Sequence, residues 1–137
     1  MLAGAIATSA LYILSVGRST SSKSLPPGCV KPTGGFLIIA SNNGFNDSIL
    51  HGAPSQTWPI ISVHQNQTVN ITVCNIDVVA HGFQVTHYYD SSIVTLTPGQ
   101  VIHVSFVANQ LGKFRVYCSI FCPIHIYMQN GELDVTS

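Results

Sequence analysis

Charged residues are scarce in this sequence. Asp, Glu, Lys and Arg make up 7% of its 137 residues, whereas a globular protein carries about 25%. Five basic residues balance five acidic ones, so the formal net charge is zero with His neutral. A protein that binds nucleic acid by neutralising phosphates needs a clustered surplus of Lys and Arg, which is missing here. We therefore exclude nucleic acid as a partner, and expect a surface built from Ser, Thr, Asn and Gln.

Helical periodicity and internal repeats are also lacking in the body of the chain. Short apolar or alternating runs are instead separated by polar turns, such as Thr97 to Gln100 and Asn109 to Gly112. Many short strands at this spacing predict an all-β domain, a β-sandwich or barrel. We expect strands at 36–40, 58–63, 68–76, 83–86, 93–96, 101–107, 113–117 and 132–135.

The N-terminal segment differs from the rest of the chain. Residues 1–17 carry no charge and are mostly Ala, Ile and Leu, which predicts a short hydrophobic membrane anchor. Residues 18–34 are rich in Ser, Pro and Gly, as in a linker. The folded domain is then expected over 35–137.

Two signals disagree about the side of the membrane on which this domain lies. Basic residues that follow the anchor would keep that side cytoplasmic, because positive charge is enriched there. Three Asn-x-Ser/Thr sequons in the body make sense only outside the cell. The sequons begin at Asn46, Asn66 and Asn70. We favour an anchor in the cell membrane with the domain on the extracytoplasmic side.

Soft metal ligands are concentrated near the C-terminus. Cys118, Cys122, His125 and Met128 lie within eleven residues of one another. Thiolate, imidazole and thioether groups select copper over hard cations. A second imidazole is needed, and His81 is well placed at the start of an expected strand. Because a thioether is a weak and adjustable ligand, this set suits electron transfer more than hydrolysis.

Zinc is the rival metal for this segment. Structural zinc sites usually pair their ligands as C-x2-C or H-x3-5-H, and the C-x3-C-x2-H-x2-M pattern fits neither form. The remaining cysteines, Cys29 and Cys74, are explained either as a disulfide in an oxidising compartment or as small buried hydrophobic residues. Four histidines without ligand-spaced neighbours are expected to be surface or core residues: His51, His64, His87 and His103.

Several motifs occur in the order, and nearly at the spacing, of a known family. They are His81-Gly82-Phe83, Leu96-Thr97-Pro98-Gly99-Gln100-Val101, Gly112-Lys113-Phe114, Cys118-Ser119-x-x-Cys122 and His125-x-x-Met128. With these motifs, the segment from Gly35 to Val135 resembles the copper A domain of cytochrome c oxidase subunit II. Nitrous-oxide reductases carry a similar domain in a far longer chain. The resemblance implies a cupredoxin-like Greek-key β-barrel or sandwich.

The same resemblance implies a binuclear copper A centre with six ligands. Cys118 and Cys122 would be the two bridging thiolates, and His81 and His125 would supply one imidazole for each copper. Met128 would be a weak thioether ligand, and Ile120 would bind through its backbone carbonyl. The implied function is that of subunit II of a haem-copper terminal oxidase. Such a subunit accepts electrons from a soluble donor and passes them to haem in subunit I, and it carries out no catalytic chemistry alone.

Three departures from the family pattern keep an alternative open. Only two residues separate Cys122 from His125, where the family has three. This shorter loop resembles that of the mononuclear blue-copper protein amicyanin, so the alternative is a blue-copper-type electron carrier or a copper chaperone. Ile120 replaces the family's usual Glu, so a magnesium role for this position is lost. The acidic docking surface is missing too, which favours a small blue-copper donor over a strongly basic cytochrome c.

Overall fold

The computed structural model describes residues 24–47 and 58–137. The expected anchor at 1–17 and His51 lie outside these residues. Within them, no helix is long and apolar enough to cross a membrane. Every regular element of the described chain is a β-strand except one short 3-10 helix, η1 (His125–Met128), so the predicted all-β class is confirmed.

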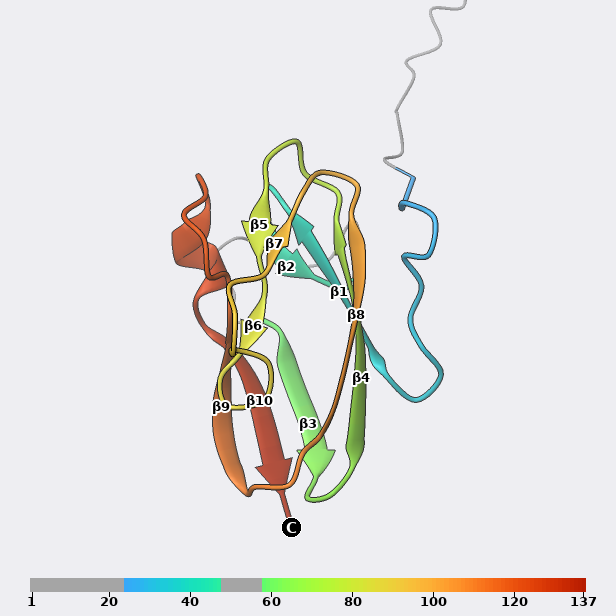
Figure 1. The fold of residues 1–137 in the computed structure, drawn as a ribbon, viewed down its shortest axis with the longest axis vertical. Helices are drawn as coiled ribbons and strands as arrows, with labels where there is room; N and C mark the ends of the chain where they lie inside the picture. The colour runs from blue at the N-terminus through green and yellow to red at the C-terminus, as the bar shows by residue number, and fades with distance from the viewer. Residues whose placement is uncertain (1–23, 48–57) are drawn as a thin grey trace, which may run out of the picture.

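Two four-stranded sheets form the body of the molecule (Figure 1). The first contains, in spatial order, β2 (Gly44–Asn46), β1 (Phe36–Ser41), β4 (Thr68–Asn75) and β8 (Val101–Val107). The second contains β3 (Ile60–His64), β10 (Gly131–Thr136), β9 (Gly112–Tyr117) and β6 (Gln84–Val85). A separate pair is formed by β5 (His81–Gly82) and β7 (Thr95–Leu96).

The chain crosses repeatedly between the two sheets. It passes from β1 and β2 to β3, returns to β4, and crosses again between β6, β8 and β9. As a result, β1 pairs in parallel with β4, and β3 in parallel with β10. Such crossovers are typical of Greek-key sandwiches. Ile61 and Val63 of β3 alternate with exposed residues, and they pack with Ile71 and Val73 of β4 in one core.

The predicted strands agree with those of the structure, with local differences. The run expected at 58–63 begins only at Ile60, because Pro59 has no N–H to donate to a ladder. The run expected at 83–86 reduces to β6, and the short strand β5 precedes it. The sequence analysis missed β2 and η1. Both are too short to show a hydrophobic period.

The three sequons lie in different environments. Asn46 is buried, and its amide donates to Ser41 Oγ at 3.3 Å and to Gly44 O at 3.4 Å. Asn66 lies in the turn after β3 with a positive φ of 68°, and Asn70 lies on β4; both are exposed. Of the three sequon asparagines, Asn66 and Asn70 are therefore accessible to solvent and Asn46 is not.

Cys29 and Cys74 form a disulfide, which decides between the two explanations for this pair. The bond joins the segment before β1 to β4, and both cysteines are buried with Ile39 in a small cluster separate from the main core. The described residues before β1 therefore lie against the outer face of the first sheet, as the blue trace shows (Figure 1).

This disulfide is expected to stabilise the fold without contributing to the metal ligands. Its sequence separation is 45 residues, for which loop-closure entropy gives about 4 kcal/mol. A Cys29→Ala/Cys74→Ala double variant should lose stability of that order in urea unfolding and keep its metal content. An unchanged unfolding midpoint would contradict the prediction.

Candidate metal centre

The predicted ligands come from three segments that meet at one end of the sandwich. His81 opens β5, Cys118 directly follows β9, and Met128 closes η1. This end is opposite the C-terminus (Figure 1). The Cys118 N–H donates to Met128 O at 2.8 Å, so the loop that carries most of the ligands is closed at its base.

Two free cysteines lie at the middle of this site. Cys118 and Cys122 are 1% and 3% exposed, and their Sγ atoms are 3.9 Å apart. His81 is fully buried beside them, and one ligand atom from each of the three residues lies within 4.8 Å of the others. Two cysteine sulfur atoms and an imidazole therefore converge in a buried environment.

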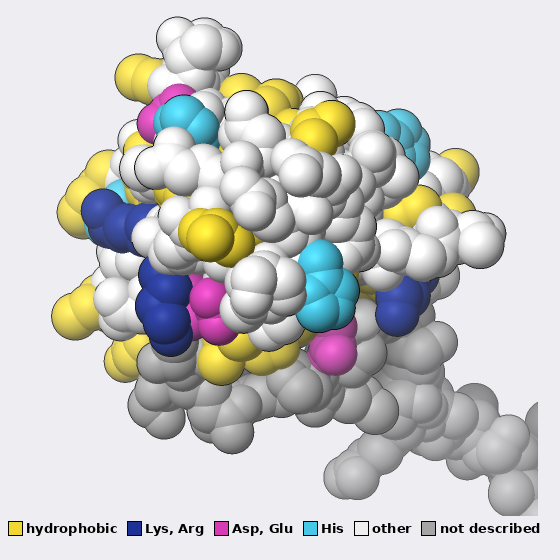
Figure 2. All heavy atoms as spheres, turned by 90° about the horizontal axis from the view of Figure 1, so that it is seen from below, with side chains coloured by type: hydrophobic (Ala, Val, Ile, Leu, Met, Phe, Trp, Pro, Cys, Tyr) yellow, Lys and Arg dark blue, Asp and Glu magenta, His cyan; other side chains and the backbone are white. Residues whose placement is uncertain are grey.

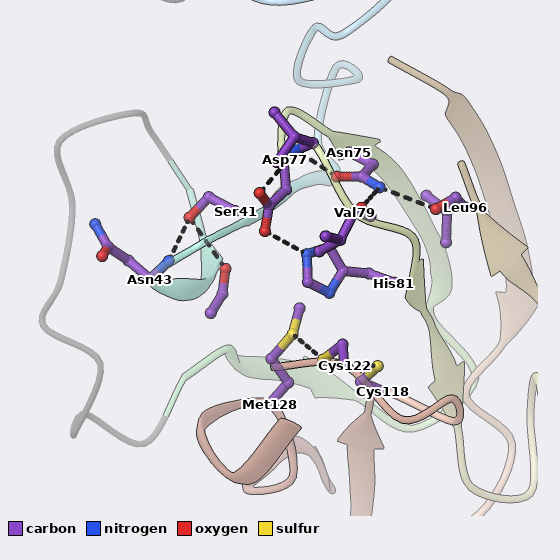
Figure 3. Close-up of polar contacts among 12 residues, drawn as sticks. Ser41, Asn43, Asn75, Asp77, Val79, His81, Leu96, Cys118, Cys122 and Met128 are labelled. Atoms are coloured by element: carbon purple, nitrogen blue, oxygen red, sulfur yellow. Dashed lines mark hydrogen bonds and ion pairs between the residues drawn. The ribbon is translucent and has the colours of Figure 1, made fainter. Parts of the chain in front are cut away.

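The other predicted ligands extend this group on both sides. Beside Cys122, the Met128 thioether lies 3.8 Å from its Sγ (Figure 3). On the other side, the Cys118 Sγ lies 3.1 Å from Ile120 O, and this same carbonyl accepts a hydrogen bond from His125 Nδ1 at 2.8 Å. The six predicted ligand groups thus form one continuous cluster, in which His125 lies beyond the compact group of three.

Asp77 fixes the orientation of the His81 ring. Its Oδ2 accepts from His81 Nε2 at 2.8 Å, which leaves Nδ1 as the free ring nitrogen. Nδ1 is buried without a hydrogen-bond partner, and it faces the sulfur atoms (Figure 3). A buried polar atom with no partner is costly unless it binds something. Asn75 in turn holds this loop, because its side chain accepts from the Asp77 N–H at 2.9 Å.

Gly82 allows β5 to approach the ligand loop closely. A Cβ on this residue would lie 2.5 Å from Ser119 Oγ and 2.7 Å from Ser119 N, so any larger side chain would displace the loop. The close approach lets the Gly82 N–H donate to Cys118 Sγ at 3.1 Å. The glycine in the His-Gly-Phe motif therefore has a direct role in supporting the thiolate.

The different environments of Cys118 and Cys122 shift the pKa values of their thiols in opposite directions. Burial favours the neutral thiol of Cys118, but the His81 ring and the Gly82 N–H favour its thiolate and lower the pKa to about 7. For Cys122, burial and the neighbouring charge of Cys118 raise the pKa to about 12. Burial also opposes charge on His81, yet Cys118 and Asp77 raise the pKa of its ring.

The residues present fit a soft, thiophilic metal ion. Metal–thiolate bonds are about 2.3 Å long, so a single ion can reach both sulfur atoms across their 3.9 Å separation. The cluster combines sulfur and imidazole donors, a chemistry that favours copper. Its buried His81 Nδ1 also lacks any other partner. The carboxylate–imidazole pair behind His81 is the usual second layer of support for a metal-binding histidine.

The residues that support the predicted ligands, Asp77 and Gln129, were not predicted from the sequence. The sequence offered one signal for Asp77, its position four residues before His81, and this signal was not used. The side chain of Gln129, which contacts the loop from outside, carried no signal at all. Of the histidines expected to be unrelated to the site, the three in the described residues, His64, His87 and His103, lie elsewhere. His103 Nδ1, for example, pairs with Thr72 Oγ1 at 3.1 Å, across β4 and β8.

Comparison with known sequences finds proteins that are similar to part of this chain. No protein-family model matches the sequence. Nitrous-oxide reductases from Pseudomonas fluorescens and Stutzerimonas stutzeri are 34% and 37% identical to it over 95 residues. The aligned part is 66% of this chain and 15% of each reductase, so the chain spans a small part of the length of these curated relatives.

Solved structures share the fold. A chain of a heme-copper terminal oxidase dimer is 24% identical, with a TM-score of 0.56 over 74% of this chain and 62% of its own. Auracyanin from Roseiflexus castenholzii has a TM-score of 0.55 at 16% identity, over 79% of this chain and 100% of its own. The periplasmic domain of cytochrome oxidase subunit II from Bradyrhizobium japonicum has a TM-score of 0.50 at 19% identity, over 73% of this chain and 81% of its own. The chain has a cupredoxin-like fold, as predicted.

In the metal-free protein, Cys118 should ionise well before Cys122. A pH titration followed by thiolate ultraviolet absorbance should show one thiolate appearing near pH 7. Because this pKa lies below that of the unfolded thiol, folding stability should rise as the pH increases above about 7 and fall as it decreases through about 7. Cys118→Ser should remove the transition and Cys122→Ser should retain it. Loss of the transition in Cys122→Ser alone would contradict the assignment.

Proposed function

We propose that this chain is the electron-accepting subunit II of a haem-copper terminal oxidase, with a binuclear copper A centre. The observation that carries the proposal is the pair of buried free thiols 3.9 Å apart, with further donors on both sides. Met128 lies next to Cys122, while Ile120 O and His125 lie beyond Cys118. An arrangement extended in this way suits two ions that share the thiolates.

Copper held by these groups would take up and release one electron at a time. The chain's own residues prepare the site for this role. Burial of both cysteines excludes water, Asp77 orients His81, and Gly82 donates to Cys118. Because these groups are already in place, little rearrangement is needed when the charge of the centre changes.

The oxidase assignment implies partners and a location, which belong to the proposal. Electrons would leave for haem in a membrane-bound subunit I, where the oxygen chemistry would take place, and a soluble donor would supply them. The domain would lie on the extracytoplasmic side of the cell membrane, attached by the N-terminal segment. The disulfide between Cys29 and Cys74 supports an oxidising compartment.

A mononuclear carrier or copper chaperone is the second candidate, because only two residues separate Cys122 from His125. In that case Cys122 alone would supply the thiolate, with His81, His125 and Met128 completing the site. Cys118 would then be a neighbour of the metal rather than a ligand. The two candidates therefore make opposite predictions for Cys118.

Substitution of each cysteine separates these candidates. The full-length chain should bind two coppers, and both Cys118→Ser and Cys122→Ser should destroy the mixed-valence spectrum of the parent, because each sulfur would bridge both ions. Metal analysis and visible spectra of the three proteins provide the measurement. A Cys118→Ser variant with one copper and an intense thiolate band would establish the mononuclear alternative.

The surface around the centre suits an uncharged contact with a redox partner. Phe121 is 93% exposed, and its ring centroid lies 5.9 Å from that of His125. Ile126 and Tyr127 are exposed nearby on η1, and residues 118–130 contain no charged side chain. Basic, acidic and His side chains appear at the opposite end of the molecule (Figure 2). Docking here would rest on apolar area rather than on charge.

Electron self-exchange between oxidised and reduced copies of the chain tests this contact. The rate should change little with salt, since balanced and sparse charges produce a weak field. Phe121→Ala should slow the exchange about tenfold, as expected for loss of an aromatic anchor. Leu111→Ala, which removes an exposed side chain from the turn between β8 and β9, is the control. A rate that falls steeply with salt, or equal rates for the two variants, would contradict apolar docking.

A further inference from the structure

Gln129 connects the two ends of the ligand loop from the outside. It caps the C-terminus of η1, and its Nε2 donates to Cys118 O at 2.9 Å. The same amide nitrogen lies 3.3 Å from His125 Nδ1, as a packing contact, because that ring nitrogen already donates to Ile120 O. Together with the bond from Cys118 N to Met128 O at 2.8 Å, this contact ties the residue that begins the loop to the turn that ends it. A single side chain thus touches two of the predicted ligand residues.

Arg115 on β9 holds the Gln129 side chain in this orientation. Its Nε donates to the backbone oxygen of Gln129 at 2.8 Å, and its Nη2 donates to Gln129 Oε1. The guanidinium group lies over the ring of Tyr117, 4.5 Å from its centroid. Because Arg115 binds the amide oxygen, the amide nitrogen turns inward to Cys118 and His125. The planar fork of an Arg provides this two-point contact, whereas a Lys has no such fork.

The segment that carries His125 needs such support. η1 is a 3-10 helix of four residues, and no side chain caps its N-terminus. Short 3-10 turns have poor hydrogen-bond geometry and little stability of their own. His125 is only half-buried, so core packing alone does not fix its ring.

We propose that Gln129 is a positioning residue of the metal centre, which holds the turn that carries His125 in place relative to Cys118, and that Arg115 keeps the Gln129 amide correctly turned. The inference rests on the proposed function only in taking Cys118 and His125 as copper ligands. It holds for one or two coppers, because Gln129 joins Cys118 to the turn that carries His125 in either case.

Competition between the full-length chain and a copper chelator tests the inference, with copper alone as the probe. Gln129→Ala should bind copper 10–100-fold more weakly, the usual effect of removing an outer partner of a metal ligand, and its copper resonance spectrum should broaden. Gln65→Ala is the matched control. Gln65 Nε2 also donates to a backbone carbonyl, that of Asn109 at 3.1 Å, in the turn after β3. This control should keep the affinity and spectrum of the parent.

Two further variants keep the test decisive if Gln129→Ala folds poorly. Gln129→Glu keeps the oxygen that Arg115 binds but has no N–H for Cys118 O, so it should lose affinity in the same range. Arg115→Lys keeps the charge without the fork, and should lose part of the affinity. Parental affinity and spectrum in Gln129→Glu would overturn the inference.

A measurement without metal separates this inference from the proposed function. In the metal-free chain, exchange of the Cys118 N–H with deuterium should be several-fold faster in Gln129→Ala than in Gln65→Ala, because the base of the loop is released. Equal exchange in the two variants would overturn the positioning role. A parent chain that binds one copper would contradict the binuclear proposal and leave this result valid.

Discussion

The burial of an ionisable thiol next to a second thiol is the constraint on which this end of the molecule depends. A thiolate removed from water is unstable unless donors or a metal surround it. Gly82 supplies a backbone N–H to Cys118, and His81 presents a buried ring nitrogen that makes no other bond. Asp77 in turn fixes that ring. Each of these neighbouring residues helps to stabilise a negative charge on the buried sulfur atoms.

The sandwich provides the rigidity that such a site needs. β5 and β9 bring His81 and Cys118 together from distant parts of the chain. β9 lies between β10 and β6 in the second sheet, and β5 pairs with β7. The disulfide lies in a separate cluster, where it fastens the residues just before β1 to the first sheet. The ligand loop is supported on one side by the buried Gly82 contact and on the other by Gln129.

Sequence reasoning worked where the signal was chemical or periodic. The spacing of Cys118, Cys122, His125 and Met128 indicated a soft metal site, and alternation over 68–76 located the strand β4. It did not reveal contacts between residues distant in sequence. Arg115 and Gln129 meet because β9 lies beside the end of η1, and no local pattern encodes that meeting. Whether Cys29 and Cys74 form a disulfide likewise depended on the parallel pairing of β1 and β4, which no spacing rule predicts.

Electron paramagnetic resonance of the oxidised, copper-loaded chain tests the central claim most directly. If Cys118 and Cys122 bridge two ions, one unpaired electron is shared, and the hyperfine pattern should be that of two equivalent copper nuclei. A pattern from a single copper nucleus, in a protein loaded to saturation, would contradict the binuclear account and assign the chain to the mononuclear carriers.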